Sequence, residues 1–204
     1  MTLTTWLSLL TISLLGAMSP GPSLAMVAKH SLAGGRTNGI STAWAHAFGI
    51  AFYAFITVIG LAVLLEQSPL LFKTLSYAGA LYLAYLGLNA LRSKGGVAEK
   101  LKSGKAVSIR QSAREGLLIS LLNPKIALFF IALFSQFIVL GNELSSNAII
   151  VLTPFVVDGL WYTLIAVIIS SSKWVNRLRA HAVLIDRLSG AVLIALAVRV
   201  FTTV

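Results

Sequence analysis

The 204-residue chain is 57% hydrophobic and only 11% charged, and its mean hydropathy is +0.90. A soluble domain carries about 25% charged residues, so this composition excludes a soluble globular protein and indicates an integral membrane protein. The absence of cysteine excludes disulfide scaffolds, thiol redox carriers and cysteine-ligated metals. The net charge of +10 does not predict nucleic-acid binding, because the basic residues lie between hydrophobic runs, as they do in positive-inside loops.

Six apolar runs are long enough to cross a bilayer, which takes roughly 17–25 residues of helix. The sequence therefore predicts an all-α integral membrane protein with six transmembrane helices. Of the 16 lysines and arginines, 13 lie in the first, third and fifth loops between these runs, and one lies in the second loop. This bias predicts that the odd loops are cytoplasmic and that both termini face the outer, periplasmic side of a bacterial inner membrane. The predicted spans are 5–28, 41–65, 69–91, 115–140, 147–171 and 185–203.

A polar, lysine-rich cytoplasmic linker at 93–114 divides the single transporter domain into two halves of three predicted helices each, 1–92 and 115–204. Because three is odd, related halves would have opposite orientations in the membrane. The stretch GALYLAYLG (79–87) in the third helix resembles GAVLIALAV (190–198) in the sixth. This similarity favours two inverted three-helix repeats, an arrangement typical of transporters.

The first and fourth predicted helices each contain a break near the middle. Proline and glycine disfavour a helix interior, and a carbonyl freed in hydrocarbon needs a partner from protein, water or substrate. Opposed half-helix ends near the bilayer centre suit the carboxylate and ammonium groups of an amino acid. The alternative is a pair of kinks that only shape the packing. The residues predicted to bind substrate are Ser19, Pro20, Gly21, Pro22, Asn123, Pro124 and Lys125.

Three ionisable side chains are candidates for roles in transport. Asp158 is an acidic residue deep in a predicted span, where an ionisable group suggests function. Because burial disfavours the charged form of a carboxyl group, Asp158 could exchange a proton; the alternatives are an ion pair with Lys125 or hydrogen bonds to helix neighbours. Lys125 either meets a substrate carboxylate or extends to the cytoplasmic surface. His46 is either a proton relay or a satisfied interior histidine. We assign Asp158 and His46 as the candidates for proton coupling.

Motifs for catalysis are missing from the sequence. It contains no nucleophile elbow, no glycine-rich phosphate loop, no metal-spaced histidine cluster and no pair of carboxylates. The sequence therefore predicts a protein that is not an enzyme and that takes no cofactor or metal. The predicted partners are a small amino-acid substrate, protons and the lipid bilayer, and not nucleic acid. The oligomeric state stays open, with a homodimer as one possibility.

Four stretches resemble, in the same order, features of the LysE-type amino-acid exporter family, in particular its homoserine/threonine-resistance branch. The resemblance covers essentially the whole chain and implies export of small amino acids from the bacterial cytoplasm by the proton-motive force. It also implies that Pro20, Gly21 and Pro22 pair with Asn123 and Pro124 as the two breaks, and that Asp158 is the buried acid. The four stretches are SPGP (19–22), YAGALYLAYLG (77–87), LLNPKIALFF (121–130) and VVDGLWY (156–162).

Two positions depart from the family pattern. His46 stands where many members of the family carry a smaller residue, which predicts a different pocket. Ser135 stands where the family often has a proline, which predicts a straighter outer part of the fourth helix.

The favoured function is a secondary active exporter of small, neutral amino acids, such as threonine, homoserine or a branched-chain residue. One alternative is a passive solute channel, which needs a continuous polar stripe and would show neither saturation nor counterflow. Another is a non-transporting membrane scaffold, in which the breaks and Asp158 would tolerate substitution.

Overall fold

The computed structural model describes residues 1–19, 21–94, 105–138, 144–169 and 180–204. These ranges are helical and contain no strand, which confirms the all-α class. Two of the described helices are long and apolar enough to cross a membrane alone, and a bent pair makes a third if it is one span. The helices are α1 (Leu3–Met18), α2 (Pro22–Gln67), α3 (Pro69–Leu91), α5 (Ile109–Leu121), α6 (Pro124–Ile138), α7 (Leu144–Ile169) and α9 (Ala182–Thr203).

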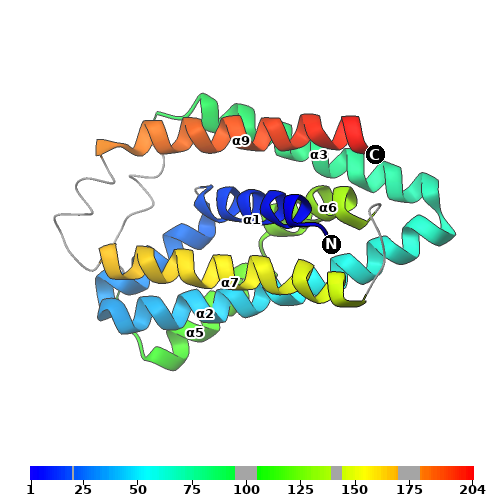
Figure 1. The fold of residues 1–204 in the computed structure, drawn as a ribbon. Helices are drawn as coiled ribbons and strands as arrows, with labels where there is room; N and C mark the ends of the chain where they lie inside the picture. The colour runs from blue at the N-terminus through cyan, green and yellow to red at the C-terminus, as the bar shows by residue number, and fades with distance from the viewer. Residues whose placement is uncertain (20, 95–104, 139–143, 170–179) are drawn as a thin grey trace.

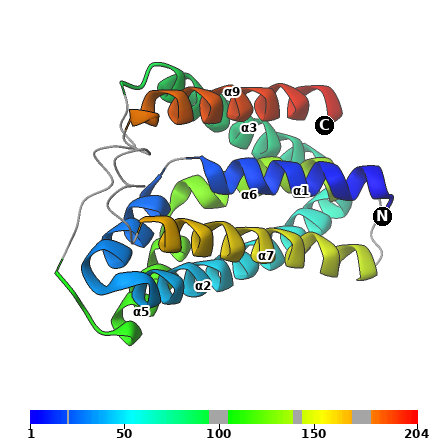
Figure 2. The same ribbon diagram turned by 60° about the vertical axis from the view of Figure 1, so that its left-hand side comes forward.

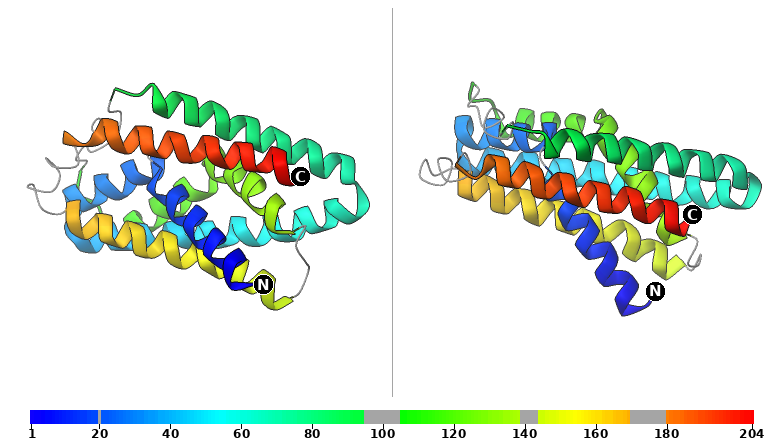
Figure 3. Two further views of the ribbon diagram at one scale, coloured as in Figure 1. Left: turned by 45° about the horizontal axis from the view of Figure 1, so that its top comes forward. Right: turned by 90° about the horizontal axis from the view of Figure 1, so that it is seen from above.

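The helices form an elongated bundle (Figures 1 and 3). Helices α3 and α9 lie side by side in one layer, and α2, α5 and α7 form the opposite layer, with α1 and α6 between them. The two termini lie at one end of the bundle (Figure 1). The C-terminal end of α3 and the N-terminal end of α5 lie at the other end, which is the end of the predicted linker.

Apolar side chains cover the outside of the bundle, and polar side chains lie inside it. Leu70 is 79% exposed and Phe48 is 64% exposed, whereas Asp158 and His46 are buried. Exposed apolar surface on this scale is a liability in water but is stable against lipid. The distribution therefore agrees with an integral membrane protein.

Helix α2 is a hairpin with its turn at Gly35. This glycine has φ 79° and ψ 180°, a conformation that is essentially restricted to glycine. The two arms lie against each other, because a Cβ added at Gly39 would overlap Oγ of Ser31 and because His46 reaches Ser23 across the turn. Figure 2 shows the two arms meeting at this turn. The prediction of a loop at 29–40, between the first two spans, is therefore wrong. The chain stays helical there and reverses its direction at a single glycine.

The predicted linker is also partly helical. Helix α5 begins at Ile109, inside the 93–114 segment, because Ser108 caps it by accepting a hydrogen bond from the backbone N–H of Gln111 at 3.2 Å. Residues 95–104 of the linker lie outside the described residues. Further on, α6 stays helical through Ser135, whose hydroxyl donates to the carbonyl of Ala132 at 3.0 Å.

Candidate functional site

Both predicted helix breaks are confirmed. Helix α1 ends at Met18 and α2 begins at Pro22; Pro20, between them, lies outside the described residues. Helix α5 ends at Leu121, and α6 begins at Pro124 with a bend of 54° between the two axes. Each new helix thus starts with proline, which tolerates the first turn because its missing N–H has no helical partner there.

The two breaks meet through Lys125. Its Nζ donates to the carbonyl oxygen of Ser19 at 3.0 Å and to Oγ of the same residue at 2.8 Å. Asn123 caps α6, because its Oδ1 accepts a hydrogen bond from the backbone N–H of Lys125 at 3.1 Å. The lysine at the start of α6 therefore reaches a carbonyl at the end of α1, inside the bundle. Lys125 therefore does not extend to the cytoplasmic surface, which is one of the two orientations expected from the sequence.

Among the described residues, Asp158 pairs with His46. The ion pair with Lys125 that the sequence left open is not the contact seen. Nδ1 of His46 lies 2.7 Å from Oδ2 of Asp158, and Nε2 lies 2.8 Å from Oγ of Ser23. The imidazole, 1% exposed, thus bridges the buried acid on α7 and the first turn of α2. The ring of Tyr162 packs edge-on against His46 with 5.2 Å between centroids. Asp158, His46 and Ser23 therefore form a continuous chain of buried polar contacts beside the first break, and the Tyr162 ring packs against it.

A small cavity of about 50 Å³ joins the break contacts to the acid, which is room for a few water molecules. Six of the predicted site residues line it, whereas Pro22 and Pro124 lie outside the lining. The wall also includes the apolar side chains Ile50, Ile126, Phe129 and Phe130. The predicted residues that line the cavity are Ser19, Gly21, His46, Asn123, Lys125 and Asp158.

Sequence reasoning missed Ser13, Ser23 and Tyr162, which also line the cavity. Tyr162 stands four residues after Asp158, so helical spacing places both on one face, and this signal was available in the sequence. Ser23 follows the first break directly. Ser13 carries no such signal; its buried hydroxyl has no hydrogen-bond partner among the described residues.

The cavity is lined by ionisable groups of both kinds, basic and acidic. The ammonium group of Lys125 and the positive N-terminal end of α6 lie on one side, and the carboxyl group of Asp158 lies on α7. A molecule that carries a carboxylate and an ammonium group matches this arrangement. In the described part of the chain, no three His, Cys, Asp or Glu side chains cluster as metal ligands would.

Comparison with known proteins gives a family match over most of the chain. The model of a family described as LysE type translocator matches residues 14–203. An uncharacterized membrane protein of Bacillus subtilis is 28% identical over 205 residues, which cover 95% of this chain and 96% of the relative. The leucine efflux protein of Salmonella typhimurium is 36% identical over 123 residues, or 58% of this chain and 56% of the relative. No solved structure matches the chain.

Proposed function

Because the chain belongs to the LysE type translocator family, whose members are transporters and not enzymes, we propose that it exports small, neutral amino acids from the bacterial cytoplasm. The substrate crosses the inner membrane outward while protons move inward. The similarity to a leucine efflux protein supports a branched-chain substrate.

The observation that carries this proposal is the cavity between the two breaks. A substrate carboxylate would replace the Ser19 oxygens as the partner of Lys125, next to the start of α6. The substrate ammonium group would meet the carboxyl group of Asp158. In the described lining, the third ionisable side chain is His46, which is already paired with Asp158, and the rest of the wall is uncharged. A cationic or acidic substrate side chain would therefore have no further charged partner. A neutral side chain therefore fits best.

The pair of Asp158 and His46 supplies a route for proton coupling. A buried carboxyl group is costly as an unpaired anion, so it needs a cation or a proton as its partner. A substrate ammonium group and a proton would therefore compete for Asp158. Protonation from the outer side would release the substrate, and loss of the proton to the cytoplasm would restore the site. His46 relays the proton because it contacts Asp158 and Ser23 with its two ring nitrogens.

The helix contacts support the inverted-repeat arrangement. Helix α1, the first half-helix of the N-terminal half, packs on α7, and α5, the first half-helix of the C-terminal half, packs on α2. The third helices of the two halves, α3 and α9, pack on each other. This reciprocity is what a two-fold relation between two three-helix units requires. In the proposed orientation the termini are periplasmic, and the Gly35 turn is cytoplasmic.

The test is efflux from bacterial cells loaded with a panel of dipeptides, with release of each amino acid followed over minutes. Cells that express the protein should release one class of neutral amino acid faster than cells with an empty vector. Collapse of the proton gradient should remove the difference. Saturation and counterflow of the released amino acid would distinguish a carrier from a channel.

Asp158→Asn should abolish the coupled efflux, because a side-chain amide neither gains nor loses a proton near neutral pH and so cannot alternate between a charged and a neutral form. The matched control is Asp186→Asn, which changes a buried aspartate that lies outside the cavity and accepts a hydrogen bond from Ser93. Equal membrane levels of both variants should be verified. Full efflux in Asp158→Asn would remove this residue from the mechanism, and no efflux of any neutral amino acid by the native chain would refute the export proposal.

A further inference from the structure

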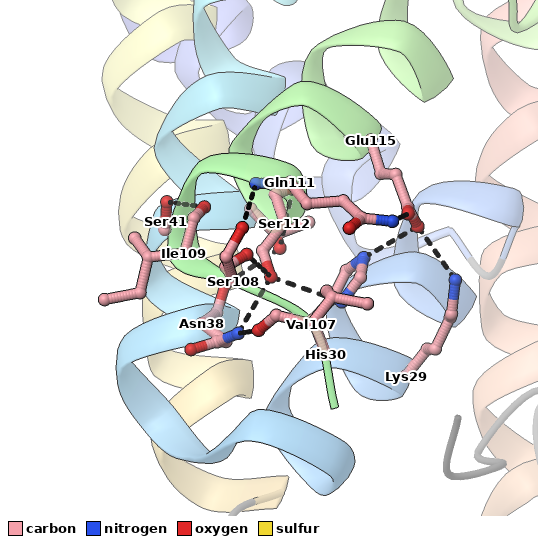
Figure 4. A network of polar contacts seen from close by, with 11 residues as sticks. Lys29, His30, Asn38, Ser41, Val107, Ser108, Ile109, Gln111, Ser112 and Glu115 are labelled. Atoms are coloured by element: carbon pink, nitrogen blue, oxygen red, sulfur yellow. Dashed lines mark hydrogen bonds and ion pairs between the residues drawn. The ribbon is translucent and has the colours of Figure 1, made fainter. Parts of the chain in front are cut away.

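A second polar cluster lies outside the cavity, between the first arm of α2 and α5 (Figure 4). Oε2 of Glu115 accepts from Nζ of Lys29 at 2.8 Å and lies 3.1 Å from Nε2 of His30. Its other oxygen, Oε1, accepts from the side-chain amide of Gln111 at 3.0 Å. One carboxylate therefore holds two basic side chains of α2 against α5. We call Lys29, His30 and Glu115 the Glu115 cluster.

The position of the cluster relates it to the cavity. The first arm of α2, residues 22–34, follows the first break, and α5 precedes the second break. Both half-helices run from the cavity toward the end of the bundle opposite the termini (Figure 1). That end carries Arg36, Arg110 and Arg114, so the positive-inside rule makes it cytoplasmic. A path from the cytoplasm to the cavity would pass between these half-helices, and Glu115 joins them.

The contacts on the two sides of α5 differ in kind. Toward the second arm of α2 the backbones touch, since a Cβ at Gly116 would overlap the carbonyl oxygen of Thr42. Ser112 adds hydrogen bonds to Asn38 and Thr42 on the same side. Toward the first arm, side chains link the helices: the Glu115 cluster, and Oγ of Ser112, which lies 3.4 Å from Nδ1 of His30.

The outer members of the cluster are accessible to water, with side-chain exposures of 38% for Lys29 and 24% for Glu115. Separating a pair of partly exposed ionic groups costs little, because water replaces each partner. Separating α5 from the second arm would instead break close backbone contacts and buried hydrogen bonds. The side of α5 that faces the first arm of α2 is therefore the side that can open.

We propose that Glu115 closes the cytoplasmic entrance of the cavity, by holding Lys29 and His30 of the first arm of α2 against α5. The proposal rests on the transport function, because only a carrier needs such an entrance. Glu115 is a positioning residue here, since it does not line the cavity. The entrance opens when the two basic side chains leave the carboxylate and let the half-helices separate.

The chain has no cysteine, so a single cysteine can report access to the cavity. Ser13→Cys is suitable, because Ser13 lines the cavity and its hydroxyl has no partner among the described residues. Labelling by a membrane-impermeant maleimide is measured in inside-out vesicles, where the cytoplasmic face is outward. Adding Glu115→Gln should raise the labelling rate by roughly 1.4- to 5-fold, the range that corresponds to loss of one partly exposed ion pair. Right-side-out vesicles should show no such increase.

Two further variants make the result specific. Arg114→Gln changes the neighbouring exposed charge on α5 and should leave the rate unchanged. The charge swap Lys29→Glu with Glu115→Lys should restore slow labelling, which a merely destabilised protein would not do. An unchanged rate in Glu115→Gln, an equal increase in Arg114→Gln, or an increase from the outer face alone would overturn the proposal. Labelling needs no substrate, so this test and the efflux test can fail separately.

Discussion

The energetic cost of the backbone conformation at Gly35 can be measured apart from any effect of side-chain packing. We consider Gly35→Ala beside Gly60→Ala, because an added Cβ has no neighbour within 4 Å at either position. Steric overlap therefore cannot account for any difference between the two variants. Gly60 is an exposed residue inside the helical second arm of α2, whereas Gly35 has φ 79°.

The expected magnitudes follow from these conformations. A non-glycine residue in the region of Gly35 costs on the order of 1–3 kcal/mol, and the lower entropy of the unfolded chain offsets roughly 0.4–1 kcal/mol of this cost. Gly35→Ala should therefore destabilise the fold by about 0.5–2.5 kcal/mol. Gly60→Ala should stabilise it by roughly 0.5–1 kcal/mol, because alanine is the better helix former.

The assay is thermal unfolding of the purified protein in one detergent at one scan rate, followed by the fluorescence of its four tryptophans. For a chain of about 200 residues, the Tm of Gly35→Ala should fall by roughly 2–8 °C. The Tm of Gly60→Ala should stay level or rise. Equal Tm values for Gly35→Ala and the native chain would show that residue 35 does not hold a positive φ, and the hairpin description of α2 would have to be abandoned.

Two further predictions concern close contacts between helices. Gly190→Ala should destabilise the fold by roughly 1–3 kcal/mol, because the new Cβ would lie 2.6 Å from the backbone carbonyl oxygen of Gly87 and force α3 and α9 apart; a Tm equal to that of the native chain would contradict this packing. Phe129→Ala should speed maleimide labelling of Ser13→Cys in right-side-out vesicles, because the Phe129 ring packs directly on Gly16 and fills the space between α1 and α6, on the side of the breaks that faces the termini (Figure 1); labelling that increases only in inside-out vesicles would show that this ring does not block access from the outer side.

Much of the site could be predicted because the chemistry of the breaks is local. Pro22 and Pro124 each stop one helix and start the next, so the interruptions are readable from the sequence. An acid such as Asp158 inside an apolar run is costly and therefore conspicuous. What the sequence could not give is the partner of each group. His46 and Asp158 are 112 residues apart, and no local pattern pairs them.

The errors at the first loop and at the linker have a common origin. Hydropathy locates the apolar core of a span, but it does not locate the helix ends, where polar residues can still be helical. Lys29 and His30 looked like loop residues, yet they continue the first arm of α2 and hold Glu115. The cap at Ser108, with Gln111 three residues later, is a readable start signal for α5 inside the linker.

Apart from the Ser13 hydroxyl, the main polar groups that line the cavity are paired with groups of the protein itself. The carbonyl freed at Ser19 accepts from Lys125, and the acid at Asp158 pairs with His46. These contacts resemble those that an amino acid would make, with Ser19 oxygens in the place of a carboxylate and the His46 ring in the place of an ammonium group. Binding a substrate therefore exchanges one set of polar contacts for another of similar kind. Only the difference between the two sets can shift the conformational equilibrium, and a small difference lets a carrier release what it has bound.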